Sequence, residues 1–216
     1  MKINILGGGP ESLLPNLQLF NGMDDFWVGV DRGVHQLLSR KIKPFIAFGD
    51  FDSVSEEEFE SISQNVGNLK KFHSDKDETD MELAITWALK QDPEVIRLFG
   101  GTGGRLDHLF ANVQLLLRPI LEGIDTTIEM IDNQNTVYVK SAGVHHVERM
   151  NKLPYISFIP ITPEIIDLTL EGFKYPLKDC HIPLGSTLCI SNELNNTYGT
   201  FSFTKGILMV IRSRDL

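Results

Sequence analysis

The spacing of apolar residues changes near residue 124, and this change constrains the fold more than any other feature of the sequence. Before it, short apolar runs alternate with amphipathic segments, which is typical of parallel strands joined by crossover helices. The predicted strands are Ile3–Leu6, Trp27–Val30, Phe45–Phe48, Leu69–Phe72 and Val95–Phe99. The predicted helices span roughly 33–40, 55–63, 79–90 and 105–118. We therefore predict an α/β domain over residues 1–124, with a Rossmann-like, mainly parallel sheet flanked by helices.

Beyond the change, the sequence holds short β-prone runs separated by Gly, Pro and Asn, and no long helical period. These runs are 126–131, 136–140, 155–159, 167–170, 187–191, 199–203 and 207–212. The pattern predicts a second, all-β domain of the sandwich or partial-barrel type over residues 125–216. The run 126–131 could instead close the first sheet.

Composition excludes several classes of partner. The 216-residue chain is long enough for one large domain or two small ones, and its net charge of −9 argues against non-specific nucleic-acid binding. No run of about 18 apolar residues is present, so no membrane span is expected, and the N-terminus lacks the pattern of a signal peptide. Cys180 and Cys189 lack metal-ligand spacing, which favours reduced thiols and a cytoplasmic location.

Two acidic runs lie within about thirty residues of each other, at 49–53 and 74–80. Asp50 and Asp52 follow a predicted buried strand, and residues two apart in extended chain point to the same side. Two unit charges 4 Å apart repel by about 4 kcal/mol at an effective dielectric of about 20, so a convergent cluster implies a bound metal, raised pKa values or basic partners. Taken alone, Asp50 and Asp52 are as consistent with a turn as with a metal site, and acidic runs in general are more often solvated loops.

The second acidic run ends at a predicted helix start. Thr79 and Glu82 have capping-box spacing, and an apolar stripe follows them. Asp80 stands at the first helical position, where the helix dipole alone favours a carboxylate. The functional alternative is that Asp80 joins Asp50 and Asp52 around Mg²⁺, which prefers hard oxygen ligands.

A glycine-rich segment, 100–108, links the predicted strand Val95–Phe99 to the next helix. Glycines allow backbone amides to approach a phosphate, the helix N-terminus favours an anion, and Arg105 can bind phosphate oxygens in a fork. The segment is neither a Walker A loop, since no Gly-Lys-Ser/Thr follows, nor a dinucleotide fingerprint, since Leu106 stands at the third glycine's place.

The order and spacing of these motifs resemble the thiamine pyrophosphokinase (thiamine diphosphokinase) family. The matching segments are Asp31-Arg32-Gly33, 49–53, 75–80, 100–108, Ser191-Asn192-Glu193 and 202–206. The resemblance spans essentially the whole chain. It implies a homodimer with the active site at the subunit interface, and transfer of the diphosphate of ATP to thiamine, giving AMP and thiamine diphosphate with Mg²⁺.

The resemblance also implies roles for individual residues. It assigns Asp50, Asp52 and Asp80 to the metal, and these three with Arg105 to catalysis, while Asp77 and Glu78 are expected to be bystanders. The ATP and phosphate contacts it implies are Asp31, Asp75, Lys76, Gly101, Gly103, Gly104, Arg105, Asp107 and His108, although His108 could equally serve helix capping or packing. Thiamine is expected to contact Asn192, Ser202 and Phe203, the last a position where many relatives carry Trp.

Two other functions remain open at this point. One is a diphosphokinase for another hydroxymethyl heterocycle, such as a pterin; the motifs at 191–193 and 202–206 favour thiamine over it. The other is a nucleotide- or thiamine-binding regulatory protein that has lost catalysis. The presence of Asp50, Asp52, Asp80 and Arg105 argues against that loss.

Overall fold

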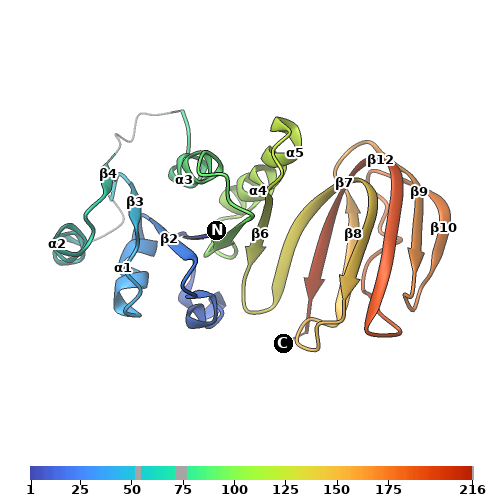
Figure 1. The fold of residues 1–216 in the computed structure, drawn as a ribbon, viewed down its shortest axis with the longest axis horizontal. Coiled ribbons are helices and arrows are strands. Elements are labelled where there is room, and N and C mark those ends of the chain that lie inside the picture. Colours follow the sequence, from blue (N-terminus) through green and yellow to red (C-terminus); the bar gives the residue numbers. More distant parts are fainter. Residues whose placement is uncertain (52–54, 72–76, 216) are drawn as a thin grey trace. The chain divides into compact units, whose positions relative to one another are not determined.

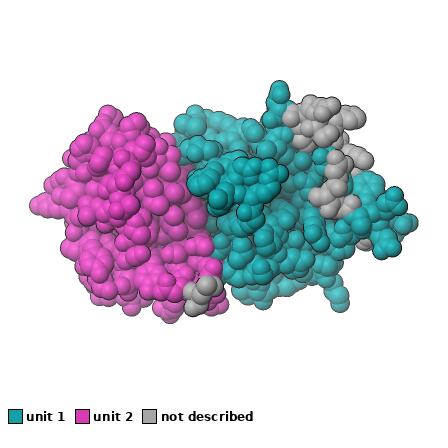
Figure 2. All heavy atoms as spheres, turned by 180° about the vertical axis from the view of Figure 1, so that it is seen from behind, with its two compact units in different colours: residues 1–133 teal, residues 134–216 magenta. Residues whose placement is uncertain are grey.

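A computed structural model describes residues 1–51, 55–71 and 77–215. The chain forms two compact units, Met1–Asn133 and Gln134–Leu216, coloured separately in Figure 2. Unit 1 alternates strands with helices, whereas the regular structure of unit 2 consists of strands (Figure 1). The predicted mixed α/β class is therefore confirmed. Among the described residues, no helix is both long and apolar enough to cross a membrane.

The strands that the structure describes in unit 1 pair in the order β6-β5-β1-β2-β3-β4. Each neighbouring pair is parallel. The strands are β1 (Lys2–Leu6), β2 (Asp25–Val30), β3 (Ile46–Gly49), β4 (Leu69–Lys71), β5 (Val95–Phe99) and β6 (Thr127–Ile131). Since β2–β4 lie on one side of β1 and β5–β6 on the other, the winding direction reverses between β1 and β5. Open parallel sheets bind ligands outside the carboxyl ends of the strands at such a reversal.

Helices cover both faces of this sheet. Helices α1 (Arg32–Ser39) and α2 (Glu56–Asn65) pack on one face, where Val34, Ala47 and Ile62 share a buried cluster. Helix α3 (Asp80–Leu89) packs on the other face, because Trp87 lies beside Phe48, with ring centroids 6.1 Å apart. The remaining helices are α4 (Leu106–Leu115), α5 (Arg118–Glu122) and the 3₁₀ turns η1 (Glu11–Leu13) and η2 (Leu17–Phe20).

The start of α3 shows the Thr79 half of the predicted capping box. Thr79 is the N-cap, and its side-chain oxygen accepts from the backbone N–H of Glu82 at 3.2 Å. The predicted apolar stripe is buried in full: Met81, Ala84, Ile85, Ala88 and Leu89. The local sequence thus places Asp80 in the first turn of α3, and the buried side of α3 packs on the sheet.

Strand β6 decides which sheet the run 126–131 joins. Its residues pair in parallel with β5, from Val95 opposite Thr127 to Phe99 opposite Ile131. The run belongs to unit 1, which is the alternative that the sequence left open.

Unit 2 is built around a long strand, β12 (Tyr198–Ser213), which pairs with β7 (Asn135–Glu148) along most of its length. Its first half also pairs with β9 (Glu164–Glu171) and its second half with β8 (Tyr155–Pro160). The register shifts between Phe203 and Ile207, and the buried positions change there from odd to even numbers. This irregularity keeps both halves facing one core, which contains Phe201, Phe203, Leu208 and Val210.

One predicted strand of this unit is wrong, and one observed strand was not predicted. The run 187–191 was predicted as a strand and forms a turn instead, with Leu188 and Ile190 exposed. The strand β10 (Leu177–Pro183), which pairs with β9, was not predicted. Edge strands such as β10 bury few side chains, so their apolar alternation is weak. The short β11 (Asn192–Glu193) pairs with β8.

Candidate active site

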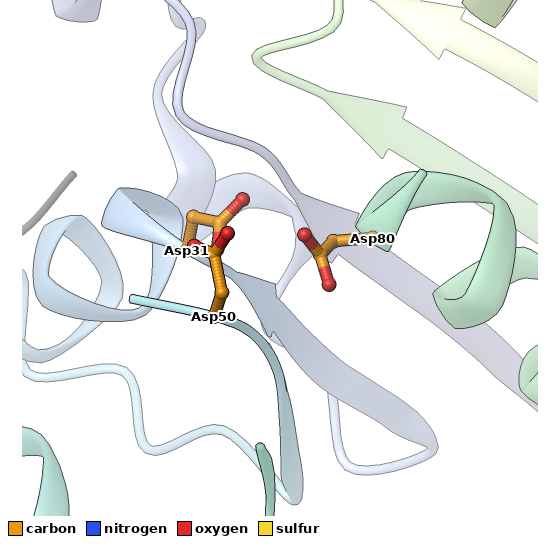
Figure 3. Close-up of side chains that lie close together, drawn as sticks. All are labelled: Asp31, Asp50 and Asp80. Atoms are coloured by element: carbon orange, nitrogen blue, oxygen red, sulfur yellow. The ribbon is translucent and has the colours of Figure 1, made fainter. Parts of the chain in front are cut away.

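Three carboxylates converge outside the carboxyl ends of the unit 1 strands. Asp31 follows β2, Asp50 follows β3, and Asp80 begins α3. One carboxylate oxygen from each lies within 4.8 Å of the other two, and all three side chains are half-buried. Figure 3 shows Asp31 and Asp50 directed toward Asp80 across the gap between them. These oxygens are close enough together for one cation to bind all three. A bound cation would offset the repulsion among the three negative charges.

The backbone at Asp31 is held in an unusual conformation. Asp31 is a non-glycine residue with φ 48° and ψ −123°, and its N–H donates to the carbonyl of Phe48 at 2.9 Å. The carboxylate lies so close to β3 that a Cβ at Gly49 would approach Asp31 Oδ1 to 2.2 Å. Residues in such sparsely populated regions cluster at functional sites. Gly49 is therefore required for the observed position of Asp31.

Phe51 fixes the turn that carries Asp50. It also has a positive φ, 61°, and its side chain is buried with Val34 and Ile62. Its ring lies 5.6 Å from that of Phe59 on α2. An aromatic side chain placed between two acidic residues thus ties the loop after β3 to the helix layer, which holds the Asp50 backbone in place.

Two glycine-rich loops lie against each other beside the carboxylates. The N–H of Gly9, in the loop after β1, donates to the carbonyl of Gly100, after β5, at 3.1 Å. A Cβ at Gly9 would come within 2.5 Å of that same oxygen. Asn112 on α4, which is buried, donates to the Gly101 carbonyl at 3.0 Å and fixes the second loop. Only residues without a side chain fit at this contact.

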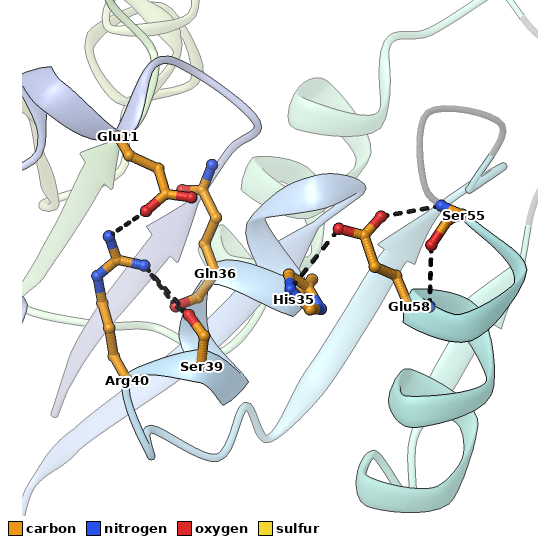
Figure 4. Close-up of polar contacts among 7 residues, drawn as sticks. All are labelled: Glu11, His35, Gln36, Ser39, Arg40, Ser55 and Glu58. Atoms are coloured by element: carbon orange, nitrogen blue, oxygen red, sulfur yellow. Dashed lines mark hydrogen bonds and ion pairs between the residues drawn. The ribbon is translucent and has the colours of Figure 1, made fainter.

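Helix α1 also contacts the first glycine loop, and Figure 4 shows the neighbouring contacts of Arg40 with Glu11 and Gln36. The buried Gln36 donates from Nε2 to the Gly9 carbonyl at 3.3 Å. Arg40 pairs with Glu11, just past the loop, at 2.7 Å, and donates to the Gln36 carbonyl at 2.8 Å. These contacts connect α1, the helix that follows Asp31, to the loop after β1.

Arg105 is paired with a neighbouring acid. It is the N-cap residue of α4, and it donates to Asp107 through Nε at 3.1 Å and through a terminal nitrogen at 2.5 Å. This contact, followed by the backbone N–H of His108, lowers the pKa of Asp107 to about 2, and it raises the pKa of Arg105. Both side chains are largely exposed, at 73% and 63%.

The carboxylates and both glycine loops line one cavity of about 820 Å³. Of the predicted site residues, it brings together Asp31, Asp50, Asp80, Gly101, Gly103, Gly104, Arg105 and His108. Asp107 lies outside the lining, and Glu78, expected to be a bystander, is part of it. The lining also includes residues given no role from the sequence: Gly7, Gly8, Gly9, Glu11, Arg32 and Gln36. A glycine run directly after the first strand was the sequence signal for part of this set.

The other predicted residues are placed differently. Asp52, Asp75 and Lys76 lie outside the described residues. In unit 2, Phe203 is 3% exposed within the core. Asn192 is 2% exposed, and its amide exchanges hydrogen bonds with the Tyr175 backbone at 3.0 and 2.9 Å. Ser202 is half-buried on the strand between two buried phenylalanines. Their assignment to thiamine stays a prediction.

Comparison with known proteins gives a consistent result over the whole chain. Two family profiles match: "Thiamin pyrophosphokinase, catalytic domain" over residues 17–128, and "Thiamin pyrophosphokinase, vitamin B1 binding domain" over residues 144–208. A curated thiamine pyrophosphokinase from Bacillus subtilis is 48% identical over 213 residues, which is 99% of each chain.

Solved structures agree with the sequence comparison. A thiamine pyrophosphokinase structure from Bacillus subtilis has a TM-score of 0.94 at 47% identity and covers 100% of both chains. One from Geobacillus thermodenitrificans has a TM-score of 0.91 at 51% identity, covering 100% of this chain and 98% of that one. The Candida albicans structure, at 16% identity, shares the fold, with a TM-score of 0.82 over 99% of this chain and 90% of its own. The chain therefore belongs to the thiamin pyrophosphokinase family.

Proposed function

We propose that this chain is a thiamine diphosphokinase, which transfers the diphosphate of ATP to thiamine. The observation that carries the proposal is the convergence of Asp31, Asp50 and Asp80 in one cavity with two opposed glycine loops. Carboxylates suit a cation that accompanies a polyphosphate, and glycine loops suit the phosphates themselves. Membership of the family supports thiamine as the acceptor over a pterin.

The reaction balances without a redox partner. The hydroxyl oxygen of thiamine attacks the β-phosphorus of ATP and forms a new P–O bond. The bond from that phosphorus to the oxygen bridging the α-phosphorus breaks, so AMP leaves with the bridging oxygen. The hydroxyl proton passes to a base or to water. Such transfers depend mainly on alignment of the attacking and leaving oxygens and on charge stabilisation.

The donor set of the cavity fits Mg²⁺. Three carboxylate oxygens within 4.8 Å of one another, with no nitrogen or sulfur ligand in that described group, match the preference of a hard cation. Asp31, Asp50 and Asp80 would hold it, together with Asp52 if that residue joins them. When bound, the ion supplies positive charge against the phosphates of the nucleotide.

The protein's own residues position the substrates. Backbone amides of Gly101, Gly103 and Gly104 approach the nucleotide phosphates, and Arg105 and His108 line the same side of the cavity. Asp107 acts indirectly, since its carboxylate holds the Arg105 guanidinium through two hydrogen bonds. Asp75 and Lys76 are assigned to the phosphates by family resemblance alone.

We also propose the finer architecture and assembly. All-parallel pairing in unit 1 supports a Rossmann-like catalytic domain, and a long strand shared by β8 and β9 around one core supports a sandwich in unit 2. The units Met1–Asn133 and Gln134–Leu216 would then be the catalytic domain and the thiamine-binding and dimerisation domain, which the sequence pattern predicts over residues 1–124 and 125–216. In a homodimer, Asn192, Ser202 and Phe203 would serve thiamine at the subunit interface. The cytoplasmic location rests on the sequence alone.

A product assay tests the function. The protein is incubated with ATP, Mg²⁺ and thiamine, and the nucleotides and thiamine esters are separated by chromatography. We expect AMP and thiamine diphosphate in equal amounts. ADP with thiamine monophosphate, or no product, would overturn the proposal, and AMP formed with a hydroxymethyl pterin but not with thiamine would transfer it to the pterin class.

A further inference from the structure

The charges that line the cavity leave one arginine available for a ligand. The described lining contains five acidic side chains, Glu11, Asp31, Asp50, Glu78 and Asp80, and two arginines, Arg32 and Arg105. A nucleotide adds several negative charges to this set. Negative charges that lie close together repel one another unless cations offset them. Each cationic side chain that faces the cavity is therefore expected to strengthen the binding of a polyphosphate.

The two arginines differ in what already binds them. Asp107 occupies two of the five N–H donors of Arg105 and brings a negative charge against its guanidinium. Arg32, by contrast, makes no hydrogen bond or ion pair with any residue that the structure describes. Its guanidinium can therefore approach an anion without first giving up a carboxylate partner.

The surroundings of Arg32 do not supply a substitute partner. Its charge helps to lower the pKa of the half-buried Glu58, after the larger effect of the Ser55 backbone N–H. That carboxylate is already bound: one oxygen accepts from Ser55 N–H at 2.8 Å, and the other lies 3.6 Å from His35 Nε2 (Figure 4). Arg32 is thus close to Glu58 but not paired with it.

The position of Arg32 suits contact with the phosphates of a nucleotide bound in the cavity. It is the first residue of α1, directly after Asp31, so its backbone is fixed beside the carboxylate cluster. A Cβ at Gly8 would lie 3.5 Å from Arg32 Cβ, in ordinary contact, so the start of this side chain lies over the first glycine loop. The side chain therefore starts between the carboxylate cluster and the glycines and lines the same cavity.

We propose that Arg32 is a phosphate-binding catalytic residue, which grips the diphosphate being transferred and stabilises its charge in the transition state. This role rests on the proposed function for the chemistry, but its binding part does not need turnover. A guanidinium offers two parallel N–H donors to a phosphate, whereas Lys offers a point charge. Gln keeps part of the aliphatic side chain but has neither the positive charge nor the guanidinium group.

Binding of α,β-methylene-ATP with Mg²⁺, measured by calorimetry, tests the proposal without turnover, because the methylene group blocks transfer. We expect Arg32→Gln to weaken binding about 10-fold or more, as for loss of a charge-assisted hydrogen bond. Arg32→Lys is expected to recover part of the affinity. Lys41→Gln, an equal charge change on an exposed residue beyond the far end of α1, is expected to bind like wild type.

Steady-state kinetics complete the test. Arg32→Gln is expected to lower kcat about 100-fold while leaving the KM for thiamine unchanged. If Arg32→Gln does not fold, Arg32→Lys is compared with wild type in both assays. Analogue affinity and kcat within twofold of wild type would overturn the proposal. A wild-type protein that binds the analogue but makes no thiamine diphosphate would overturn the proposed function instead, and the affinity comparison would still decide the role of Arg32 in phosphate binding.

Discussion

The two units use their buried and half-buried polar groups in opposite ways. In unit 1, Asp31, Asp50 and Asp80 face one another across an open cavity, and the backbone at Asp31 is strained. In unit 2, Asn192 and Arg212 are almost fully buried and bind backbone groups of their own unit. The first arrangement costs stability and prepares a site, whereas the second holds loops in place.

Arg212 shows the structural pattern most clearly. It is 4% exposed and donates to the carbonyls of Glu148 at 2.8 Å and Leu153 at 3.1 Å, so it fastens the connection between β7 and β8. Burial lowers its pKa. A buried polar residue of this unit can therefore stabilise the fold without contacting a ligand.

The largest effect is expected from Asp50→Asn. Losing one carboxylate of the cluster should lower kcat about 1,000-fold or more, because charge stabilisation by a bound cation is worth several kcal/mol. The melting temperature should change little or rise, because the substitution removes one of three negative charges that repel one another. The matched control is Asp77→Asn, an exposed residue outside the cavity lining, which should keep normal turnover. Near-normal turnover in Asp50→Asn would contradict the metal assignment.

Gly49→Ala tests whether the site depends on backbone geometry. The added methyl would meet Asp31 Oδ1 at 2.2 Å, so the carboxylate must move. We expect kcat to fall about 10- to 100-fold, the range for a misplaced catalytic group. Gly67→Ala is the control, because a Cβ there meets nothing within 4 Å. Equal activity in the two variants would show that the close approach is unimportant.

Asn192→Ala tests the contrasting case in unit 2. Its amide accepts from Tyr175 N–H and Glu193 N–H and donates to the Tyr175 carbonyl. Removing it should lower the free energy of unfolding by about 2 kcal/mol, measured by urea denaturation. Unchanged stability with a raised KM for thiamine would instead make Asn192 a ligand contact and blur the distinction between the units.

The smallest effect concerns pH. The Arg105–Asp107 contact lowers the pKa of Asp107 to about 2, so its stabilising effect is complete above about pH 4 and is lost as pH falls through about 2. Carbon-detected NMR of the Asp107 carboxyl should show this low midpoint in the wild type. In Arg105→Gln the midpoint should move up toward the ordinary value, and an unmoved midpoint would show that Arg105 is not the cause.

Local sequence patterns predicted unit 1 well. The capping pair and apolar stripe fixed α3, and the apolar runs located the strands to within a few residues. The family motifs pointed to Asp50, Asp80 and Asp31 separately. Their convergence depends on the strand order, the positive φ of Asp31 and the absent Cβ at Gly49, which are relations between distant segments.

Unit 2 was harder to predict because pairing, rather than propensity, decides it. Two runs predicted as separate strands, 199–203 and 207–212, form the single strand β12 with a register shift between them. In unit 1, Arg32 belongs to the matching segment Asp31-Arg32-Gly33 but was given no role, and the sequence around Gln36 carried no pattern that separates a cavity lining from a helix surface. Gln36 lies beside the first glycine loop because its side chain donates to the carbonyl of Gly9, which is 27 positions away in the sequence.

The central claim is that three side chains from three separate segments form one cation site. Electron paramagnetic resonance of Mn²⁺, used in place of Mg²⁺ with α,β-methylene-ATP present, measures it directly. We predict that wild type binds the ion and that Asp31→Asn, Asp50→Asn and Asp80→Asn each weaken binding about 10-fold or more. Unchanged Mn²⁺ affinity in all three variants would contradict the account.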